Sequence, residues 1–144
     1  MVACVDTSFL VSLYGRDANS TPAQKMAADF RVPLAFTPLL RHEARNAIRL
    51  AVFRKEITAT ERERVVAAID ADVQTGALAD TPLTWADVYA HAETLSANRT
   101  EQLGTRASDV LHVAAALALG AKVFYTFDTR QKALATAAGL KVKP

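Results

Sequence analysis

Short apolar runs alternate with helix-like patterns along the whole chain, and this alternation restricts the fold more than any other feature. A βα rhythm of this kind predicts a largely parallel sheet with helices packed on its faces. The runs that we assign to strands are 2–5, 34–37, 77–79, 122–127 and 140–142. The helical patterns cover 7–14, a segment opening at Ser20-Thr21-Pro22, 38 to about 55, a segment opening at Thr60-Glu61-Arg62-Glu63, 85–97, 106–119 and 129–138. We therefore expect an α/β fold whose central, mostly parallel sheet has four or five strands.

The composition fits a single domain spanning 1–144. With 144 residues and a hydrophobic content of 51%, the chain is large enough to bury a sizeable core. Its one cysteine, Cys4, lies in an apolar run, which predicts a buried thiol, no internal disulfide and a reducing cytoplasm. The formal charge of +2 is too small to indicate a polyanionic partner by itself. The sequence starts without an export leader, and the run 110–121 is interrupted and short of the roughly 20 residues of a membrane span, so we expect no membrane insertion.

Two aspartates follow apolar runs directly. Asp6 comes after the first run and Asp128 after the run that ends at Phe127. The carboxyl ends of parallel strands form the edge where α/β proteins bind ligands. Each aspartate taken alone is also an ordinary helix N-cap, so a functional interpretation depends on other acids joining them.

Two further acids lie on the apolar sides of predicted helices. On a helical wheel Glu43 falls among Leu39, Leu40, Ala47, Leu50 and Ala51, away from an arginine stripe. It therefore points into a site, meets an arginine in a buried pair, or sits at an edge of the apolar arc that the real helix exposes. Asp109 begins a helix that is apolar on nearly every side. It either points into a site or caps that helix, with Thr105 and Ser108 as competing caps.

Four converging carboxylates raise one another's pKa and oppose folding unless a cation neutralises them. Because all the candidate ligands are oxygens, Mg²⁺ or Mn²⁺ is favoured over zinc or copper. Water held by such an ion attacks a phosphodiester readily. His112 lies one helical turn after Asp109, and we interpret it as a packed histidine hydrogen-bonded near the site rather than as a ligand.

Four segments in order resemble the PIN-domain nucleases, and VapC-type toxin ribonucleases in particular. They are Val5 to Leu10, the central helix with Glu43 and Asn46, the stretch from Arg106 to Ala116, and Thr126-Phe127-Asp128. The resemblance covers essentially the whole chain and implies a three-layer fold around a parallel sheet. It also implies that Asp6, Glu43, Asp109 and Asp128 form the acidic quartet, and that Thr7 and Thr126 help to orient it. Implied partners are an RNA substrate, a cognate antitoxin and a second copy in a homodimer.

Our interpretation is an Mg²⁺- or Mn²⁺-dependent endoribonuclease. Asp6 and Asp109 are the principal metal ligands, Asp128 completes the metal shell, and Glu43 ligates or orients the attacking water. Arg106 either pairs with Asp109, which we favour, or approaches a substrate phosphate. The arginines of the stripe, Arg41, Arg45 and Arg49, fit a solvated face better than an RNA track, and Trp85, Tyr89 and Tyr125 fit core packing better than base stacking.

The alternatives belong to other classes. Aspartyl-phosphate phosphatases place a second acid two residues after the first strand's aspartate, where this chain has Ser8. Phospho-receiver domains need an acidic pair at the first strand, and only Asp6 stands there. A catalytically silent module that binds RNA or protein through the same fold remains the main alternative, and weak binding of Mg²⁺ or Mn²⁺ distinguishes it.

Overall fold

The centre of the molecule is a parallel β-sheet in the computed structural model, which describes residues 2–144. The strands are β1 (Cys4–Val5), β2 (Leu34–Phe36), β3 (Leu78–Asp80), β4 (Val123–Tyr125) and β5 (Lys141–Lys143). β1 pairs with β4, β4 with β5 and β2 with β3, all in parallel. A parallel bridge between Ala3 and Leu34 joins the two groups, which gives the order β3-β2-β1-β4-β5. The expected parallel sheet of four or five strands is confirmed.

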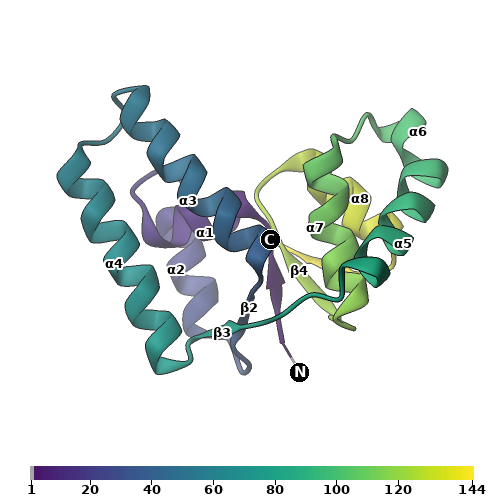
Figure 1. Ribbon diagram of the computed structural model, residues 1–144, viewed down its shortest axis with the longest axis horizontal. Coiled ribbons are helices and arrows are strands. Elements are labelled where there is room, and N and C mark those ends of the chain that lie inside the picture. The colour runs from purple at the N-terminus through teal and green to yellow at the C-terminus, as the bar shows by residue number, and fades with distance from the viewer. Residues whose placement is uncertain (1) are drawn as a thin grey trace.

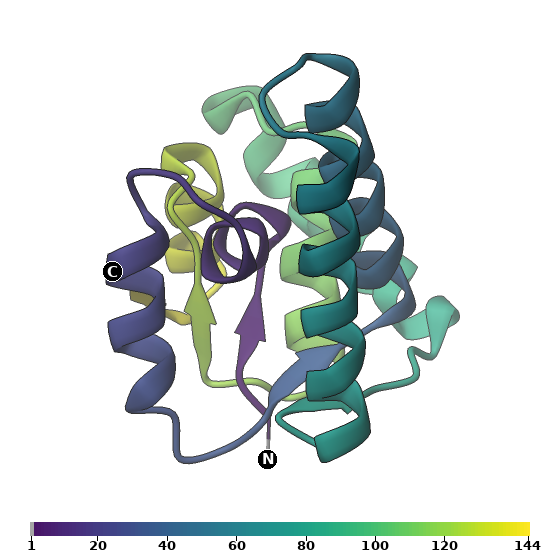
Figure 2. The ribbon, with the colours of Figure 1, turned by 90° about the vertical axis from the view of Figure 1, so that its left-hand side faces the viewer.

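Helices cover both faces of the sheet (Figures 1 and 2). They are α1 (Thr7–Tyr14), α2 (Ser20–Ala28), α3 (Pro38–Phe53), α4 (Ala59–Thr75), α5 (Trp85–Leu95), α6 (Glu101–Leu103), α7 (Ala107–Ala118) and α8 (Thr129–Ala137), with a π-helical turn, η1 (Ser96–Thr100), between α5 and α6. Figure 1 shows α1 to α4 on one side of the strands and α5 to α8 on the other. The three-layer arrangement is therefore confirmed. No helix in residues 2–144 is both long and apolar enough to cross a membrane.

Each face of the sheet has its own apolar core, because successive side chains of a strand point to opposite faces. Cys4 and Phe124 belong to the core beneath α5, α7 and α8. Val5 and Tyr125, their neighbours in the chain, belong to the core beneath α1 to α4. Cys4 is 5% exposed, as predicted for a small buried thiol. The tight packing of both faces fixes the strand ends, and with them the residues that follow each strand.

Local signals set most helix boundaries close to the predicted ones. Thr37 caps α3 by accepting a hydrogen bond from Leu40 N, and Pro38 follows as the first helical residue, where its missing N–H costs nothing. The start predicted at Thr60 is wrong: the side chain of Thr58 accepts from Glu61 N at 3.1 Å and α4 begins at Ala59. An N-cap accepts from the residue two or three positions on, so either threonine satisfied the sequence pattern.

The segment between α5 and α7 differs most from expectation. We predicted one helix over 85–97, whereas α5 ends at Leu95 and the chain continues through the π-helical turn into α6. Gly104 then adopts φ of +64°, a left-handed conformation that glycine accepts without a steric penalty. This turn ends the helical run and lets the chain start α7 on a new axis.

Candidate active site

Asp6 and Asp128 lie at the same edge of the sheet. Asp6 follows β1 directly, and its backbone N–H donates to Tyr125 O of β4 at 3.1 Å. Asp128 comes three residues after Tyr125. Since β1 and β4 are parallel neighbours, their carboxyl ends meet and bring the two turns together. The sequence prediction that both acids mark the carboxyl edge is confirmed.

Asp6 is a buried carboxylate whose oxygens are held by the protein. Its side chain caps α1, with Oδ1 accepting from Phe9 N at 3.0 Å and from Ser8 Oγ at 2.7 Å. Thr126 Oγ1 donates to Oδ2 at 2.6 Å. Asp6 is 3% exposed, and no lysine or arginine in the described residues forms an ion pair with it. Burial raises the pKa of the Asp6 carboxyl, and these three hydrogen bonds offset part of that rise.

Asp128 is held less tightly. Its Oδ1 accepts from the backbone N–H groups of Arg130 and Gln131, both at 2.9 Å, so it caps α8. Its own N–H donates to Thr126 Oγ1 at 2.9 Å. One buried hydroxyl group thus touches both acids at the strand ends. Asp6 and Asp128 are therefore helix N-caps, as the sequence indicated. The carboxyl group of Asp6 is in addition buried, which an N-cap does not require.

Glu43 points inward from α3, as the helical wheel predicts. Thr7 Oγ1 donates to Glu43 Oε2 at 2.9 Å, and His112 Nε2 contacts the same oxygen while lying 3.2 Å from Thr7 Oγ1. Burial opposes the charge of Glu43, but the hydrogen bond and charge of His112, the Thr7 hydrogen bond and the charge of His42 outweigh it and lower the pKa of Glu43. The alternative in which Glu43 pairs with an arginine is wrong. The interpretation of His112 as a packed, hydrogen-bonded histidine is confirmed.

Asp109 occupies the third position of α7, one turn before His112. The helix begins at Ala107 with Arg106 as N-cap, so none of Asp109, Thr105 and Ser108 is the N-cap residue, but the Asp109 side chain does cap the first turn as the N3 member of a capping box. Its Oδ2 accepts a long hydrogen bond, 3.4 Å, from Arg106 N. The Arg106 guanidinium lies 3.6 Å away with its side chain 69% exposed, so solvent screens this pair. Asp109 is therefore a second buried carboxylate, 7% exposed, with little neutralisation from the protein.

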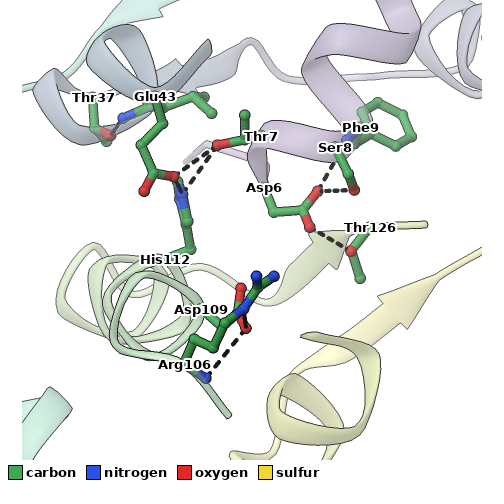
Figure 3. A network of polar contacts seen from close by, with 11 residues as sticks. Asp6, Thr7, Ser8, Phe9, Thr37, Glu43, Arg106, Asp109, His112 and Thr126 are labelled. Atoms are coloured by element: carbon green, nitrogen blue, oxygen red, sulfur yellow. Dashed lines mark hydrogen bonds and ion pairs between the residues drawn. The ribbon is translucent and has the colours of Figure 1, made fainter. Parts of the chain in front are cut away.

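Figure 3 shows the labelled side chains of Asp6, Glu43 and Asp109 arriving in one neighbourhood from three elements. Contacts link them: Thr7, next to Asp6, bonds both Glu43 and His112, and Asp109 lies on the same helix as His112. The acids do not form a finished cage, because no three histidine, cysteine or acidic side chains in residues 2–144 lie close enough together to hold a metal ion. Each acid instead has hydrogen-bond partners of its own: Thr126, Ser8 and Phe9 N for Asp6, Thr7 and His112 for Glu43, and Arg106 N for Asp109.

Three of the four supporting residues predicted from the sequence contact an acid. Thr7 and Thr126 hold Glu43 and Asp6, and Arg106 lies beside Asp109. Asn46 is instead exposed on α3, where we find no hydrogen bond for it among the described residues. Sequence reasoning missed Ser8, which we used only as evidence against an aspartyl-phosphate phosphatase. The signal was present, since Ser8 lies only two residues after Asp6, within reach of its carboxylate.

The arginine stripe and the aromatic residues lie outside this network. Arg41 pairs with Asp80 and Arg45 with Asp70, each at 2.9 Å, as expected of a solvated helix face. The prediction of core packing is right for Tyr125, which packs against Phe9. It is wrong for Trp85 and Tyr89, which are 39% and 53% exposed and lie with ring centroids 6.0 Å apart on α5. The buried residues of α5 are Val88, Ala92 and Leu95; Tyr89 lies to the side of this row, and Trp85 is the first residue of the helix.

Comparison with known proteins extends over nearly the whole chain. The family model of the PIN domain matches residues 3–137. No curated protein matches the sequence. Similar solved structures include VapC20 of Mycobacterium tuberculosis, described as a sarcin–ricin loop cleaving toxin, which is 23% identical with a TM-score of 0.70 and 99% of each chain covered.

Two further solved structures contain a chain with the same fold. VapBC2 of Rickettsia felis, bound to a DNA fragment from its promoter, is 16% identical with a TM-score of 0.67, over 99% of this chain and 98% of that one. VapBC-1 of nontypeable Haemophilus influenzae is 16% identical with a TM-score of 0.64, over 99% and 97%. These matches run from end to end, so they include every element that carries one of the four acids.

Proposed function

Because the chain belongs to the PIN domain family, we propose that it is an Mg²⁺- or Mn²⁺-dependent endoribonuclease that hydrolyses RNA phosphodiester bonds. The observation that carries this proposal is the pair of buried carboxylates, Asp6 and Asp109, at the carboxyl edge of the sheet. Asp6 has no cationic partner among the described residues, and Asp109 has only the largely exposed guanidinium of Arg106, 3.6 Å away. Burying such charges without compensation is costly, and it is understandable where a cation completes the site.

The donor atoms fit a hard divalent cation. Asp6 Oδ1 already accepts two hydrogen bonds, whereas Oδ2 accepts one from Thr126, which leaves a lone pair for an ion. Mg²⁺ is commonly held by one or two carboxylates and several waters, so a complete cage of acids is not required. In our proposal Asp6 and Asp109 hold the ion and Asp128 completes its shell. A bound ion would supply an activated water and stabilise the charge that develops on the phosphate.

In this proposal the remaining residues orient the attacking water, hold the metal ligands in place and bind the substrate. Glu43, fixed on its Oε2 side by Thr7 and His112, orients the attacking water. Thr126 keeps Asp6 Oδ2 in place and links it to the turn of Asp128. Arg106 pairs with Asp109 in the free protein, as we favoured from the sequence, and we propose that its exposed guanidinium also approaches a substrate phosphate.

We further propose that the protein is the toxin of a type II toxin–antitoxin pair. The support is the fold shared with VapC20 and with the VapBC complexes. A cognate antitoxin that covers the acids, a homodimeric assembly and a cytoplasmic location belong to this proposal. Co-expression with the product of a neighbouring gene, followed by copurification and loss of cleavage, tests the antitoxin.

The direct test is cleavage of a structured RNA pool by the purified protein, with Mn²⁺ or with a chelator, beside Asp6→Asn. Asparagine keeps a capping oxygen for α1 but removes the charge. We expect discrete products that need both the metal and Asp6. If the RNA stays intact and wild type and Asp6→Asn bind the metal equally weakly, the proposed nuclease function is contradicted.

One observation favours a second candidate, a catalytically silent PIN-fold module that binds RNA or protein. The described residues contain no ready group of three metal-ligating side chains. Metal titration separates the two candidates, because a nuclease site binds Mn²⁺ through Asp6 and Asp109 whereas an interaction module has no use for the ion.

A further inference from the structure

The contact between His112 and Glu43 connects two helices from opposite faces of the sheet. Glu43 belongs to α3, which contributes Leu40, Ala44 and Ile48 to one core, and His112 belongs to α7, which packs in the other. Figure 3 shows the imidazole of His112 reaching the carboxylate of Glu43, with Thr7 beside them. The three side chains form a closed triangle of polar contacts around Glu43 Oε2.

Packing does not require a histidine at this position. The residues around it on α7, from Val110 to Ala116, are otherwise apolar, and the side chain of His112 is 5% exposed. A leucine would fill such a place without the cost of burying a polar ring beside a carboxylate. The histidine is therefore best explained by what its Nε2 does for Glu43.

Glu43 has a reason to be held. A glutamate side chain has three rotatable bonds, and a group that orients a reactant must stay within a fraction of an ångström of its productive position. Its Oε2 is fully engaged by Thr7 and His112, while Oε1 accepts no hydrogen bond from the described part of the chain. One oxygen is anchored and the other is available to a water or a substrate hydroxyl.

We propose that His112 is a positioning residue: with Thr7 it fixes Glu43 Oε2, so that Glu43 serves as the water-orienting group and not as a metal ligand. This inference rests on the proposed nuclease function and adds a residue to it. It divides the acids into two groups with different tasks. Asp6 and Asp109 bind the ion, and Glu43 is kept apart from them by its own partners.

The test is a double-variant cycle on the full chain, measured as kcat and KM for metal-dependent RNA cleavage. The four proteins are wild type, His112→Leu, Glu43→Gln and the double variant, with Asp6→Asn as the inactive baseline. We expect His112→Leu to lower kcat about tenfold to a hundredfold, as losses of orienting partners typically do, with little change in KM. In the Glu43→Gln background the same change should have no further effect. If the loss of kcat in the double variant is the product of the losses in the two single variants, the proposal is overturned.

Two polar variants separate positioning from folding, and they decide the matter if His112→Leu does not fold. The amide nitrogen of His112→Gln reaches the place of Nε2, whereas that of His112→Asn is nearer the place of Nδ1. Gln should restore most of kcat and Asn should not. Equal activity of the two variants overturns the proposal. If the wild type cuts no RNA in Mn²⁺, the proposed nuclease function is contradicted. If the wild type does cut RNA but the effects of the His112 and Glu43 changes are independent, only the positioning role of His112 is contradicted.

Discussion

Thr126 carries one hydroxyl group that serves two acids of the site, and replacing it by valine tests how much the site depends on that group. Its Oγ1 donates to Asp6 Oδ2 at 2.6 Å and accepts from Asp128 N at 2.9 Å, and the residue is completely buried, with 0% of its surface exposed. Valine has nearly the same shape but no hydroxyl. The change therefore removes both hydrogen bonds and little else.

The cost follows from the chemistry of the two bonds. A hydrogen bond to a charged group contributes about 1.5–3 kcal/mol to the free energy of unfolding, and a buried donor left unpaired costs about 1–3 kcal/mol. Asp128 is only partly buried, so water can replace the bond of its N–H. We expect a total loss of about 2–3 kcal/mol. For a chain of this length that lowers the melting temperature by about 4–12 °C.

The loss should also depend on pH. The Thr126 hydrogen bond lowers the pKa of Asp6 against the effect of burial, so the valine variant raises that pKa further. A carboxyl group whose pKa is higher in the folded state than in the unfolded state binds its proton more tightly when folded. It therefore destabilises the fold increasingly as the pH rises from the ordinary pKa of the group through its folded-state pKa. Thr126→Val should therefore be more destabilising near pH 7 than at acidic pH below the raised pKa of Asp6, where the carboxyl group is protonated.

The assay is thermal unfolding of wild type, Thr126→Val and Thr126→Ser in a metal chelator at several pH values. Serine keeps the hydroxyl and loses one methyl group, at a cost of about 1 kcal/mol. A valine variant that is no less stable than the serine variant, and whose deficit is independent of pH, refutes the reasoning.

Three further predictions concern the same molecule. Without metal near neutral pH, Asp6→Asn should melt at a higher temperature than wild type, because asparagine keeps a capping oxygen and removes a buried charge. This gain in melting temperature should shrink as the pH falls towards the ordinary aspartate pKa of 3.8. A melting temperature below that of wild type at neutral pH contradicts the prediction. Mn²⁺ at about 100 times its Kd should stabilise the wild type by about 2.7 kcal/mol in thermal melts and leave Asp6→Asn unshifted; equal shifts argue against Asp6 as a ligand. Tyr14→Phe removes the 2.5 Å hydrogen bond to Asp72 Oδ2 and should lower the free energy of unfolding in denaturant by about 1.5–3 kcal/mol. RNA cleavage should stay unchanged, because Tyr14 lies at the opposite end of α1 from Asp6. Reduced cleavage by the fully folded variant contradicts this independence of Tyr14 from the site.

The sequence was sufficient for the strands, for most of the helices and for the direction of the acids, but not for the π-helical turn and α6. The alternation of apolar runs and helical patterns predicts the parallel sheet, and the place of Asp6 and Asp128 after two runs puts them at one edge. Helical geometry was enough to turn Glu43 inward, because α3 is long and amphipathic. These features follow from local periodicity, which a single sequence contains.

Tertiary partners were beyond such reasoning. A helical wheel shows that Glu43 and His112 both face inward, but not that helices from opposite faces of the sheet bring them into contact. Trp85 and Tyr89 look like core residues by composition, and only the packing of α5 reveals which of its sides is covered. Asn46 lies at the edge of the apolar arc, where a small rotation of the helix decides between a site and solvent.

The hydrogen bond between Asp6 and Thr126 closes a loop across 120 positions of the chain. A contact of such long sequence separation forms late in folding, because the entropy of the intervening chain must first be lost. β1 reaches its place between β2 and β4 only when the segment beyond α7 has been made and has docked. A nascent chain on the ribosome therefore carries Asp6 from the start without the hydroxyl that fixes its Oδ2, and this part of the acidic edge can form only after Thr126 has been made.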